Sequence, residues 1–279
     1  MGNRFMSETN RVVHPWNATA SGQYLLDWEQ QRCDEAVSDI FGYHSLQWGM
    51  PMLQGLRTNR MPHRWLALES PEQAAWCPAA AQEGEVAADS PRWAPAFYAD
   101  FRALPLADAC MDLLILPHTL ELSPDPHATL REVARVLVPE GRVVITGLNP
   151  VSLWGLRQRR AHLYRRLGFG ELYLPAEGEF INYWRMRDWL RLLGFEVESG
   201  RFGLYRPAVR SEAWLERCRW FDTVGERWWP IFGAVYFIVA VKRVRGMRLL
   251  PADWKRRPAI ATAPMPVAGR MHSEGKTRD

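Results

Sequence analysis

Apolar positions in the first quarter of the chain change from a helical to a strand-like period. From residue 22 to 42 they recur three or four positions apart, which predicts a helix with one buried face that ends at Gly42. The apolar stretches that follow are short and consecutive, as expected for strands, and they lie at 63–69 and 97–100. A segment rich in alanine, proline and glutamate separates these two predicted strands.

Strands and helices alternate most clearly in the middle of the chain. Consecutive apolar residues predict a buried strand at 111–116, an amphipathic helix at 126–137 and another buried strand at 142–146. Strands that alternate with helices imply crossover connections and a parallel sheet covered on both faces. The chain is therefore predicted to be an α/β protein.

The last third of the pattern adds two helices and two strands. Helices are predicted at 186–193 and 211–229, and strands are predicted to begin at 195 and to span 232–243. We expect these two late strands to pair antiparallel at the edge of the sheet, through a hairpin-like link.

One domain is expected to span residues 1–250, with an insertion at 150–185 that is rich in aromatic and basic residues. Residues 251–279 are rich in proline, alanine and charge, so we expect a disordered tail there. The longest apolar run, 230–241, is too short to cross a bilayer of roughly 30 Å as a helix. Its β-branched and aromatic residues favour a strand.

The composition fits a globular protein and excludes several classes of function. The chain has 279 residues, of which 47% are hydrophobic and 24% are charged. A net charge of +4 is too small to indicate nucleic-acid binding, so no nucleic-acid partner is expected. The four cysteines are scattered without a Cys-x-x-Cys pair, which suits reduced thiols in the cytosol. We expect a cytoplasmic protein without a metal site.

Ligands of open α/β sheets bind at the carboxyl ends of the strands, so the residues after each predicted strand form the candidate site. Glu69 ends its strand about twenty residues after Gly49, where a carboxylate can accept hydrogen bonds from both hydroxyls of a ribose. Asp100 ends the next strand and could accept from an adenine amino group, while Phe101 or Leu104 packs against the ring. Either acid alone is more readily explained as a loop residue, but the pair indicates a nucleoside site.

The segment 98–147 carries a series of motifs at fixed spacing. They stand here as Asp100, Leu104-Pro105-Leu106, Met111-Asp112, Asp125-Pro126, Glu132, Arg135, Leu137, Pro139 and Gly141. With these motifs the segment resembles the class I S-adenosylmethionine-dependent methyltransferases, in the subgroup called type 11. The resemblance extends more weakly over about 44–149.

The resemblance implies a Rossmann-like three-layer sandwich, whose seven-stranded sheet is mostly parallel with the last strand antiparallel. It implies S-adenosylmethionine as the cofactor, with Glu69 on the ribose and Asp100 near the adenine. The activity would be methyl transfer to a small molecule. Aromatic residues crowd 149–185 and 203–230, where a wall for a flat or hydrophobic acceptor could form, although they could equally pack the insertion itself.

The first motif of the family is changed in this chain. The family pattern is Asp-x-Gly-x-Gly-x-Gly, and the matching positions here hold Gln47, Gly49, Pro51 and Leu53, before what reads as a helix. Gly49 would let a cofactor approach the backbone, whereas Pro51 removes an N–H group and Leu53 adds bulk. The loop therefore leaves a second hypothesis open, a non-catalytic methyltransferase-like binding or regulatory protein that has lost the cofactor.

A third hypothesis is a nicotinamide-dependent oxidoreductase, because an acid after the second strand also serves NAD. The absence of a Gly-x-Gly-x-x-Gly sequence argues against it.

His118 is the candidate catalytic base, because it follows the fourth strand where the transferred methyl group would lie in this family. Glu121 is a weaker candidate. A base is needed only where the acceptor atom carries a proton. A single histidine is more often structural than catalytic, so the structural role remains the main alternative.

A basic amphipathic stretch, 157–166, follows the fifth strand. Such a stretch is most often a solvated helix face. Its leucines would also suit contact with anionic lipid at a membrane surface, and its position would suit a lid over the site.

Overall fold

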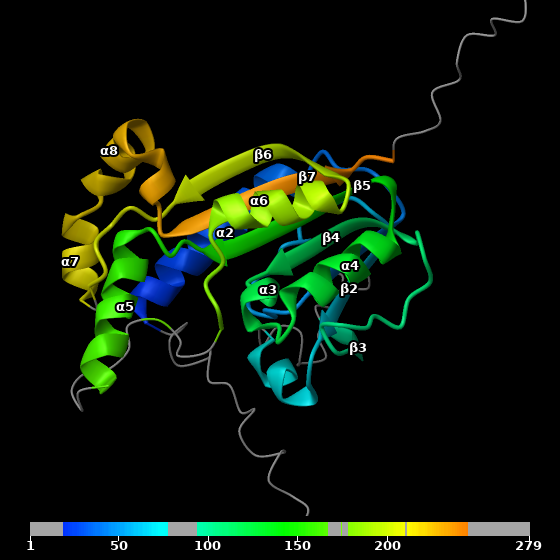
Figure 1. Ribbon diagram of the computed structural model, residues 1–279, viewed down its shortest axis with the longest axis horizontal. Helices are drawn as coiled ribbons and strands as arrows, with labels where there is room; N and C mark the ends of the chain where they lie inside the picture. The colour runs from blue at the N-terminus through cyan, green and yellow to red at the C-terminus, as the bar shows by residue number, and fades with distance from the viewer. Residues whose placement is uncertain (1–18, 78–93, 167–173, 175–177, 210, 245–279) are drawn as a thin grey trace, which may run out of the picture. The chain divides into compact units, whose positions relative to one another are not determined.

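The computed structural model describes residues 19–77, 94–166, 174, 178–209 and 211–244 (Figure 1). The elements in chain order are α2 (Ala20–Val37), β1 (His44–Trp48), β2 (His63–Leu68), the 3-10 helix η1 (Pro71–Trp76), β3 (Pro95–Tyr98), β4 (Met111–Pro117), α3 (Thr119–Leu122), α4 (Pro126–Val136), β5 (Leu137–Leu148), α5 (Leu153–Arg166), α6 (Tyr183–Leu192), β6 (Phe195–Gly203), α7 (Glu212–Arg217), α8 (Trp220–Trp228), the 3-10 helix η3 (Pro230–Phe232) and β7 (Val235–Lys242).

The strands form one seven-stranded sheet in the order β3-β2-β1-β4-β5-β7-β6. Strands β1 to β5 pair parallel to one another, and β7 runs antiparallel between β5 and β6. This confirms the predicted α/β class and the mostly parallel sheet with its last strand antiparallel.

The connection between the last two strands differs from the prediction. Strands β6 and β7 do pair antiparallel, but α7, α8 and η3 lie between them in the chain, so the link is not a hairpin. The helix predicted at 211–229 is split at Cys218 into α7 and α8. Because β7 pairs on both sides, the edge strand is β6.

Helices cover both faces of the sheet, as Figure 1 shows. Leu130, Val133 and Val136 of α4 pack with Met186 and Leu190 of α6 on one face. On the other face, α2 packs over β4, β5 and β7. Each fully buried leucine or valine stabilises the fold by roughly 1.5–3 kcal/mol relative to exposure. The two apolar layers fix the strand ends rigidly.

Helix α2 begins at a side-chain cap, where the Thr19 hydroxyl accepts a hydrogen bond from the Gly22 N–H at 3.2 Å. It ends at Val37, before the predicted end at 42. Gly42 lies outside the helix and packs so tightly against Asp112 that a Cβ would overlap that side chain. The glycine therefore serves close packing rather than helix termination.

No helix follows β1, in contrast to the prediction. The residues between β1 and β2 form turns. Leu53, Leu56 and Met61 of this segment are buried and pack with Cys33 and Val37 of α2. The turns thus fill part of the layer that a helix would otherwise fill.

The described part of the predicted insertion is mainly α5, and much of 167–177 lies outside the described residues. The predicted boundary at 250 and the predicted tail at 251–279 also lie outside them. Among the described helices, none has the length and apolar character needed to cross a membrane.

Candidate functional site

The carboxyl ends of β1, β2 and β3 adjoin at one edge of the sheet. Trp48 pairs with Ala67, and Leu68 pairs with Tyr98, so the three strands end nearly level. Gly49 directly follows β1, Glu69 directly follows β2, and Asp100 lies two residues beyond β3. The sheet therefore brings together three residues that the sequence predicted for the site.

Gly49 occupies a position that favours glycine. Its φ angle is +89°, in the left-handed region, and an ideal Cβ would lie 3.1 Å from the Thr119 hydroxyl. Its N–H donates to the carbonyl of Ala67 at 2.9 Å, which ties the turn to the neighbouring strand. The result is a tight turn whose backbone carries no side chain at the strand-end edge.

Gln47 organises the turn from beneath it. The side chain is fully buried, and its Nε2 donates to the carbonyls of Gly49, Met50 and Leu53 at 3.2, 3.0 and 2.8 Å. Its Oε1 accepts from the N–H of Gly55 at 2.9 Å. A carboxylate could not donate to these carbonyls, so the change from the family's acid to glutamine fits this loop.

The bulky residue of the loop does not fill the strand-end edge. Leu53 is buried and packs with the α2 side chains Cys33 and Val37 on one face of the sheet. Pro51 is also buried. The added bulk of Leu53 therefore contributes to the core.

Asp100 already has a partner. Its carboxylate accepts from the Arg102 guanidinium at 2.7 and 3.0 Å and from the Arg102 N–H at 2.8 Å. These hydrogen bonds hold the pKa of Asp100 below its ordinary value, so the group is ionised at neutral pH. A nucleoside amino group would have to share this carboxylate with Arg102. Glu69 is half-buried, and its N–H donates to the Gln73 side chain at 3.2 Å.

Phe101 and Leu104 are core residues in this structure. Both are buried in the cluster that packs against α4 and α6. The centres of the Phe101 and Trp48 rings lie 5.5 Å apart. They support the strand-end edge from within and present little surface to a ligand ring.

A buried charged cluster lies at the carboxyl end of β4. His118 follows β4 with a left-handed φ of 52°, and its side chain is only 11% exposed. Its Nε2 lies 2.8 Å from a Glu29 oxygen, and its Nδ1 lies 2.8 Å from a Glu121 oxygen. The other oxygen of Glu121 accepts from the Leu148 N–H, so the cluster ties α2, β4 and β5 together.

The electrostatics of this cluster favour a protonated histidine. Burial by itself would lower the pKa of His118, but the charges of Glu29 and Glu121 outweigh it and hold the pKa well above its ordinary value. Burial raises the pKa of Glu121. An imidazolium with both nitrogens bonded to carboxylates cannot accept a proton, so this geometry suits a fixed cation rather than the predicted general base.

Sequence reasoning missed Glu29, which comes from α2 and not from a strand end. Its signal was present, because Leu25, Glu29, Cys33 and Val37 recur every four residues and all are buried. An acid within an apolar stripe requires a buried partner. Glu29 Oε2 has no hydrogen-bond partner among the described residues, although the side chain is fully buried. A donor or cation that reached this oxygen would remove the free-energy penalty of burying it without a hydrogen bond.

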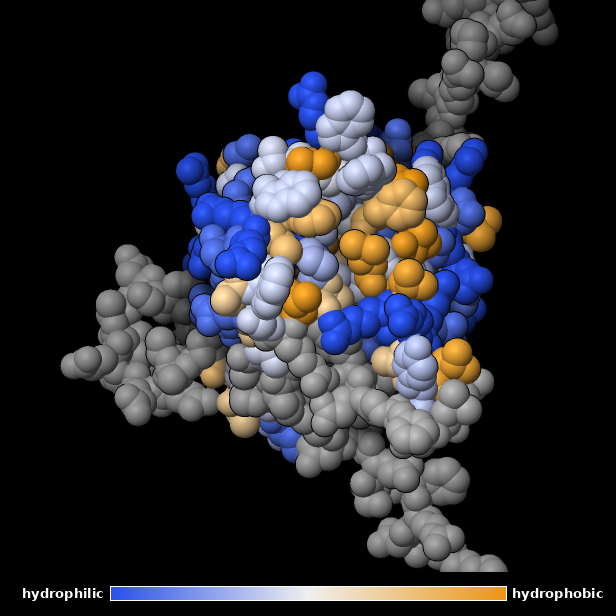
Figure 2. All heavy atoms as spheres, turned by 90° about the vertical axis from the view of Figure 1, so that its left-hand side faces the viewer, coloured by the Kyte–Doolittle hydropathy of each residue, from blue (hydrophilic) through white to orange (hydrophobic). Residues whose placement is uncertain are grey.

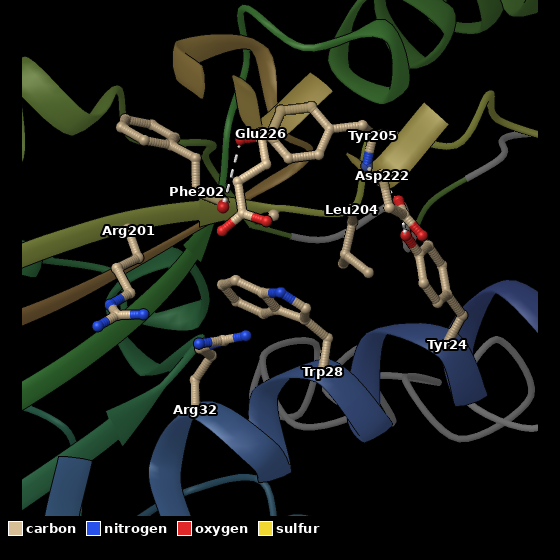
Figure 3. Close-up of a pocket in the computed structure, with 10 residues that line it drawn as sticks. Tyr24, Trp28, Arg32, Arg201, Phe202, Leu204, Tyr205, Asp222 and Glu226 are labelled. Atoms are coloured by element: carbon tan, nitrogen blue, oxygen red, sulfur yellow. Dashed lines mark hydrogen bonds between the residues drawn. The ribbon is translucent and has the colours of Figure 1, made fainter. Parts of the chain in front are cut away.

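A pocket of about 170 Å³ lies beside the end of β6, between α2 and α8 (Figure 3). Trp28 of α2 forms its floor, with Arg32 and Arg201 at one end, and Glu226 points into it from α8. Gly203 is required there, because a Cβ would overlap the Trp28 ring. The pocket thus combines an aromatic floor with charged groups of both signs.

The far wall of this pocket is held by partly buried polar contacts. The Tyr24 hydroxyl donates to Asp222, and Arg206 donates to the same carboxylate at 2.8 Å. The Tyr205 hydroxyl donates to the carbonyl of Pro230 at 2.8 Å. These contacts hold α8 against α2 and the end of β6, so the pocket is preformed.

The aromatic residues predicted to wall an acceptor pocket divide into two groups. Trp154 is buried, and its Nε1 donates to the carbonyl of Arg206 at 2.8 Å. Trp184, Trp214, Trp220, Trp228 and Trp229 are exposed. These six tryptophans do not line the pocket in Figure 3, which takes its rings from Tyr24, Trp28, Phe202 and Tyr205, and of these four only Tyr205 falls within the predicted segments.

Within the described ranges, no group of three or more His, Cys, Asp or Glu side chains is placed to hold a metal ion.

Comparisons with known proteins agree with this fold. Residues 58–145 match the family model described as "Methyltransferase domain". The match begins after the altered loop. The chain is 37% identical over 167 residues to the uncharacterized protein YafS of Escherichia coli K12. That alignment covers 59% of this chain and 62% of YafS, so it spans less than two thirds of the relative.

Solved methyltransferases share the fold at low identity. A chain in the complex between the Haloferax volcanii Trm112 methyltransferase activator and a methyltransferase aligns with a TM-score of 0.54 and 18% identity, covering 84% of this chain and 99% of that one. A SAM-dependent methyltransferase from Thermotoga maritima aligns with a TM-score of 0.53 and 14% identity, and the alignment covers 82% of this chain and 93% of that one. The family implies S-adenosylmethionine as its cofactor. By sequence motif, by the family match over residues 58–145 and by fold, this chain is similar to the class I S-adenosylmethionine-dependent methyltransferases of type 11.

Proposed function

We propose that this protein transfers a methyl group from S-adenosylmethionine to a small molecule with a flat, partly hydrophobic body. The observation that carries the proposal is the placement of Gly49 and Glu69 directly after adjacent parallel strands, in the fold of the family. A ligand at this edge meets a backbone without a side chain and a carboxylate beside it.

The residues at this edge fit the two ends of the cofactor. Glu69 would accept hydrogen bonds from the ribose hydroxyls, and the left-handed turn at Gly49 would let the nucleoside approach the backbone. The unpaired Oε2 of Glu29 is a suitable counter-charge for the sulfonium at the methionine end. This would replace the charge that the family carries at the position of Gln47. S-adenosylmethionine, once bound, supplies the electrophilic methyl group.

The pocket beside β6 is our candidate for the acceptor. It lies at the same edge of the sheet, since β6 ends there at Gly203. Its size admits a small ring on the Trp28 floor, and Arg201 could bind an anionic substituent. The chain would hold acceptor and cofactor in line and exclude water. In this proposal His118 positions Glu29, and no side chain serves as an obligatory base.

Calorimetric titration of the purified full chain tests the cofactor site. We expect micromolar binding of S-adenosylmethionine and S-adenosylhomocysteine, weakened at least tenfold in Glu69→Gln. Glu72→Gln changes an exposed glutamate three residues away and should bind as the unaltered protein does. Equal affinity of both variants would contradict the assignment of Glu69.

The role of Glu29 has its own test in the same titration. Glu29→Gln should weaken S-adenosylmethionine more than S-adenosylhomocysteine, because only the former carries a sulfonium charge near the carboxylate. Equal losses for the two ligands would contradict the assignment. The fold of the variant is checked by circular dichroism before titration.

A second candidate function, a non-catalytic binding or regulatory protein, is favoured by specific observations. Gln47 makes four hydrogen bonds to the loop backbone, and Arg102 forms an ion pair with Asp100. The family match begins only at Thr58, beyond the loop. If neither sulfur cofactor binds, this candidate replaces the enzyme. NADH serves as the third titrant, and binding of NADH alone would instead support an oxidoreductase.

A further inference from the structure

Exposed aromatic and apolar side chains gather on the helices beyond the carboxyl edge of the sheet. Those of α7, α8 and η3 are Trp214, Trp220, Trp228, Trp229, Ile231 and Phe232, each between 45% and 70% exposed. Those on and just before α5 are Val151, Leu153, Leu156, Leu163 and Tyr164. We call these eleven residues the tryptophan surface. Exposure of this much apolar area is unusual for a folded chain and indicates an interaction site.

The helices that carry the tryptophan surface are joined to one another. Trp154 of α5 donates to the carbonyl of Arg206, and Arg206 pairs with Asp222 of α8 at 2.8 Å and with Glu216 of α7 at 3.5 Å. Figure 2 views the side of the molecule that carries these helices, and it shows apolar side chains gathered beside a strip of hydrophilic ones. The helices that carry the tryptophan surface are therefore held together as one part of the fold.

The hydrophilic side chains of α5 are cationic. Arg157, Arg159 and Arg160 are exposed, and the sequence of α5 contains no Asp or Glu. Near Trp214, the Arg217 guanidinium lies 5.2 Å from the ring centre. Tryptophan and arginine side by side suit the boundary between lipid headgroups and acyl chains, where the ring is partly buried and the cation meets phosphate.

We propose that the tryptophan surface binds the surface of an anionic lipid bilayer. The exposed arginines of α5 complement anionic headgroups, and the tryptophans of α8, with Trp229 directly after it, supply apolar anchors. A second copy of the chain is a poorer fit, because a symmetric contact through α5 would bring its arginines together. The proposal does not depend on cofactor binding.

Vesicle flotation with the full chain tests this proposal. We expect binding to vesicles of 70% phosphatidylcholine and 30% phosphatidylglycerol, little binding to pure phosphatidylcholine, and weaker binding at 1 M salt. Replacing the three α5 arginines with glutamine should weaken binding about 100-fold, on the basis of roughly fivefold for each arginine. The matched control replaces three exposed arginines of α6, Arg185, Arg187 and Arg191, and removes the same charge.

A second pair of variants tests the aromatic part of the surface. Trp220→Ser with Trp228→Ser should lower binding at least tenfold. Phe41→Ser with Tyr43→Ser removes two aromatic rings that are 74% and 72% exposed, at the amino end of β1, and should leave binding unchanged.

Three results would overturn the proposal. They are failure to float with anionic vesicles, an equal loss in the α5 and α6 variants, and a dimer in solution that Trp220→Ser with Trp228→Ser converts to a monomer. The last result would assign the surface to a second copy of the chain.

Discussion

The two halves of the carboxyl edge hold their acidic residues in opposite ways. After β2 and β3, Glu69 is half-buried and Asp100 is half-exposed. Around the end of β4, Glu29 and Glu121 are buried on either side of His118. Partly exposed acids lower the stability of the fold little in the absence of a ligand, because water solvates their charge. Buried acids lower it strongly unless neighbouring groups compensate their charge.

This difference separates acids that solvent can reach from acids that hold the edge in place. A half-exposed carboxylate can exchange water for a ligand hydroxyl at small cost. The buried cluster connects α2 to the ends of β4 and β5, so it fixes the position of one edge of the site. Variants of the partly exposed acids should affect ligand binding without affecting stability, whereas variants of the buried acids should affect stability, and Glu29→Gln should affect both.

The largest expected effect is on the cluster. His118→Leu leaves two buried carboxylates without their shared cation, and we expect a loss of about 3–5 kcal/mol in the free energy of unfolding. Chemical denaturation measures it. His127→Leu changes an exposed histidine of α4 and should cost within about 0.5 kcal/mol. Similar losses of unfolding free energy in the two variants would show that the cluster contributes no more to stability than an exposed histidine does.

A smaller loss is expected beneath the glycine turn. Gln47→Leu keeps the volume but removes the amide that bonds to three carbonyls and to the Gly55 N–H, so we expect a loss of about 2–3 kcal/mol. Gln47→Glu tests the donor requirement, because a carboxylate cannot donate to the carbonyls. A Gln47→Glu protein as stable as the original would contradict the role given to the amide.

The smallest expected effect is a dependence of stability on pH. Because the folded-state pKa of His118 lies above its unfolded value near 6.5, the folded protein keeps a proton that the unfolded chain releases. Stability should therefore be fully present below about pH 6.5 and fall as pH rises towards the folded-state pKa, by at most about 1.4 kcal/mol per pH unit. The raised pKa of Glu121 acts in the same direction at lower pH. Thermal melts of His118→Gln should show a flatter profile over pH 6–9.

The sequence predicted the strand-end positions that local pattern determines. Strand ends follow from apolar runs, so Gly49, Glu69 and Asp100 could be assigned to one edge before the structure was known. The roles of Phe101 and Leu104 depend on which way a loop side chain turns, and both turn into the core. No local pattern determines that choice.

The charged cluster could not be predicted in the same way. Glu29 and His118 are 89 positions apart in sequence, and their contact depends on how α2 lies across the sheet. The buried glutamate within the apolar stripe of α2 signalled a partner without identifying it. Gln47 could be misread from the sequence alone. Glutamine in place of the family's acid suggests lost cofactor binding, whereas in the structure its amide bonds to three carbonyls of the loop.

The most direct test of the central claim is a crystal structure of the full chain with S-adenosylhomocysteine. The ribose hydroxyls should lie within hydrogen-bond distance of the Glu69 carboxylate, beside Gly49, with the His118 cluster unchanged. A nucleoside bound elsewhere, or a ligand-free edge at saturating ligand, would contradict it.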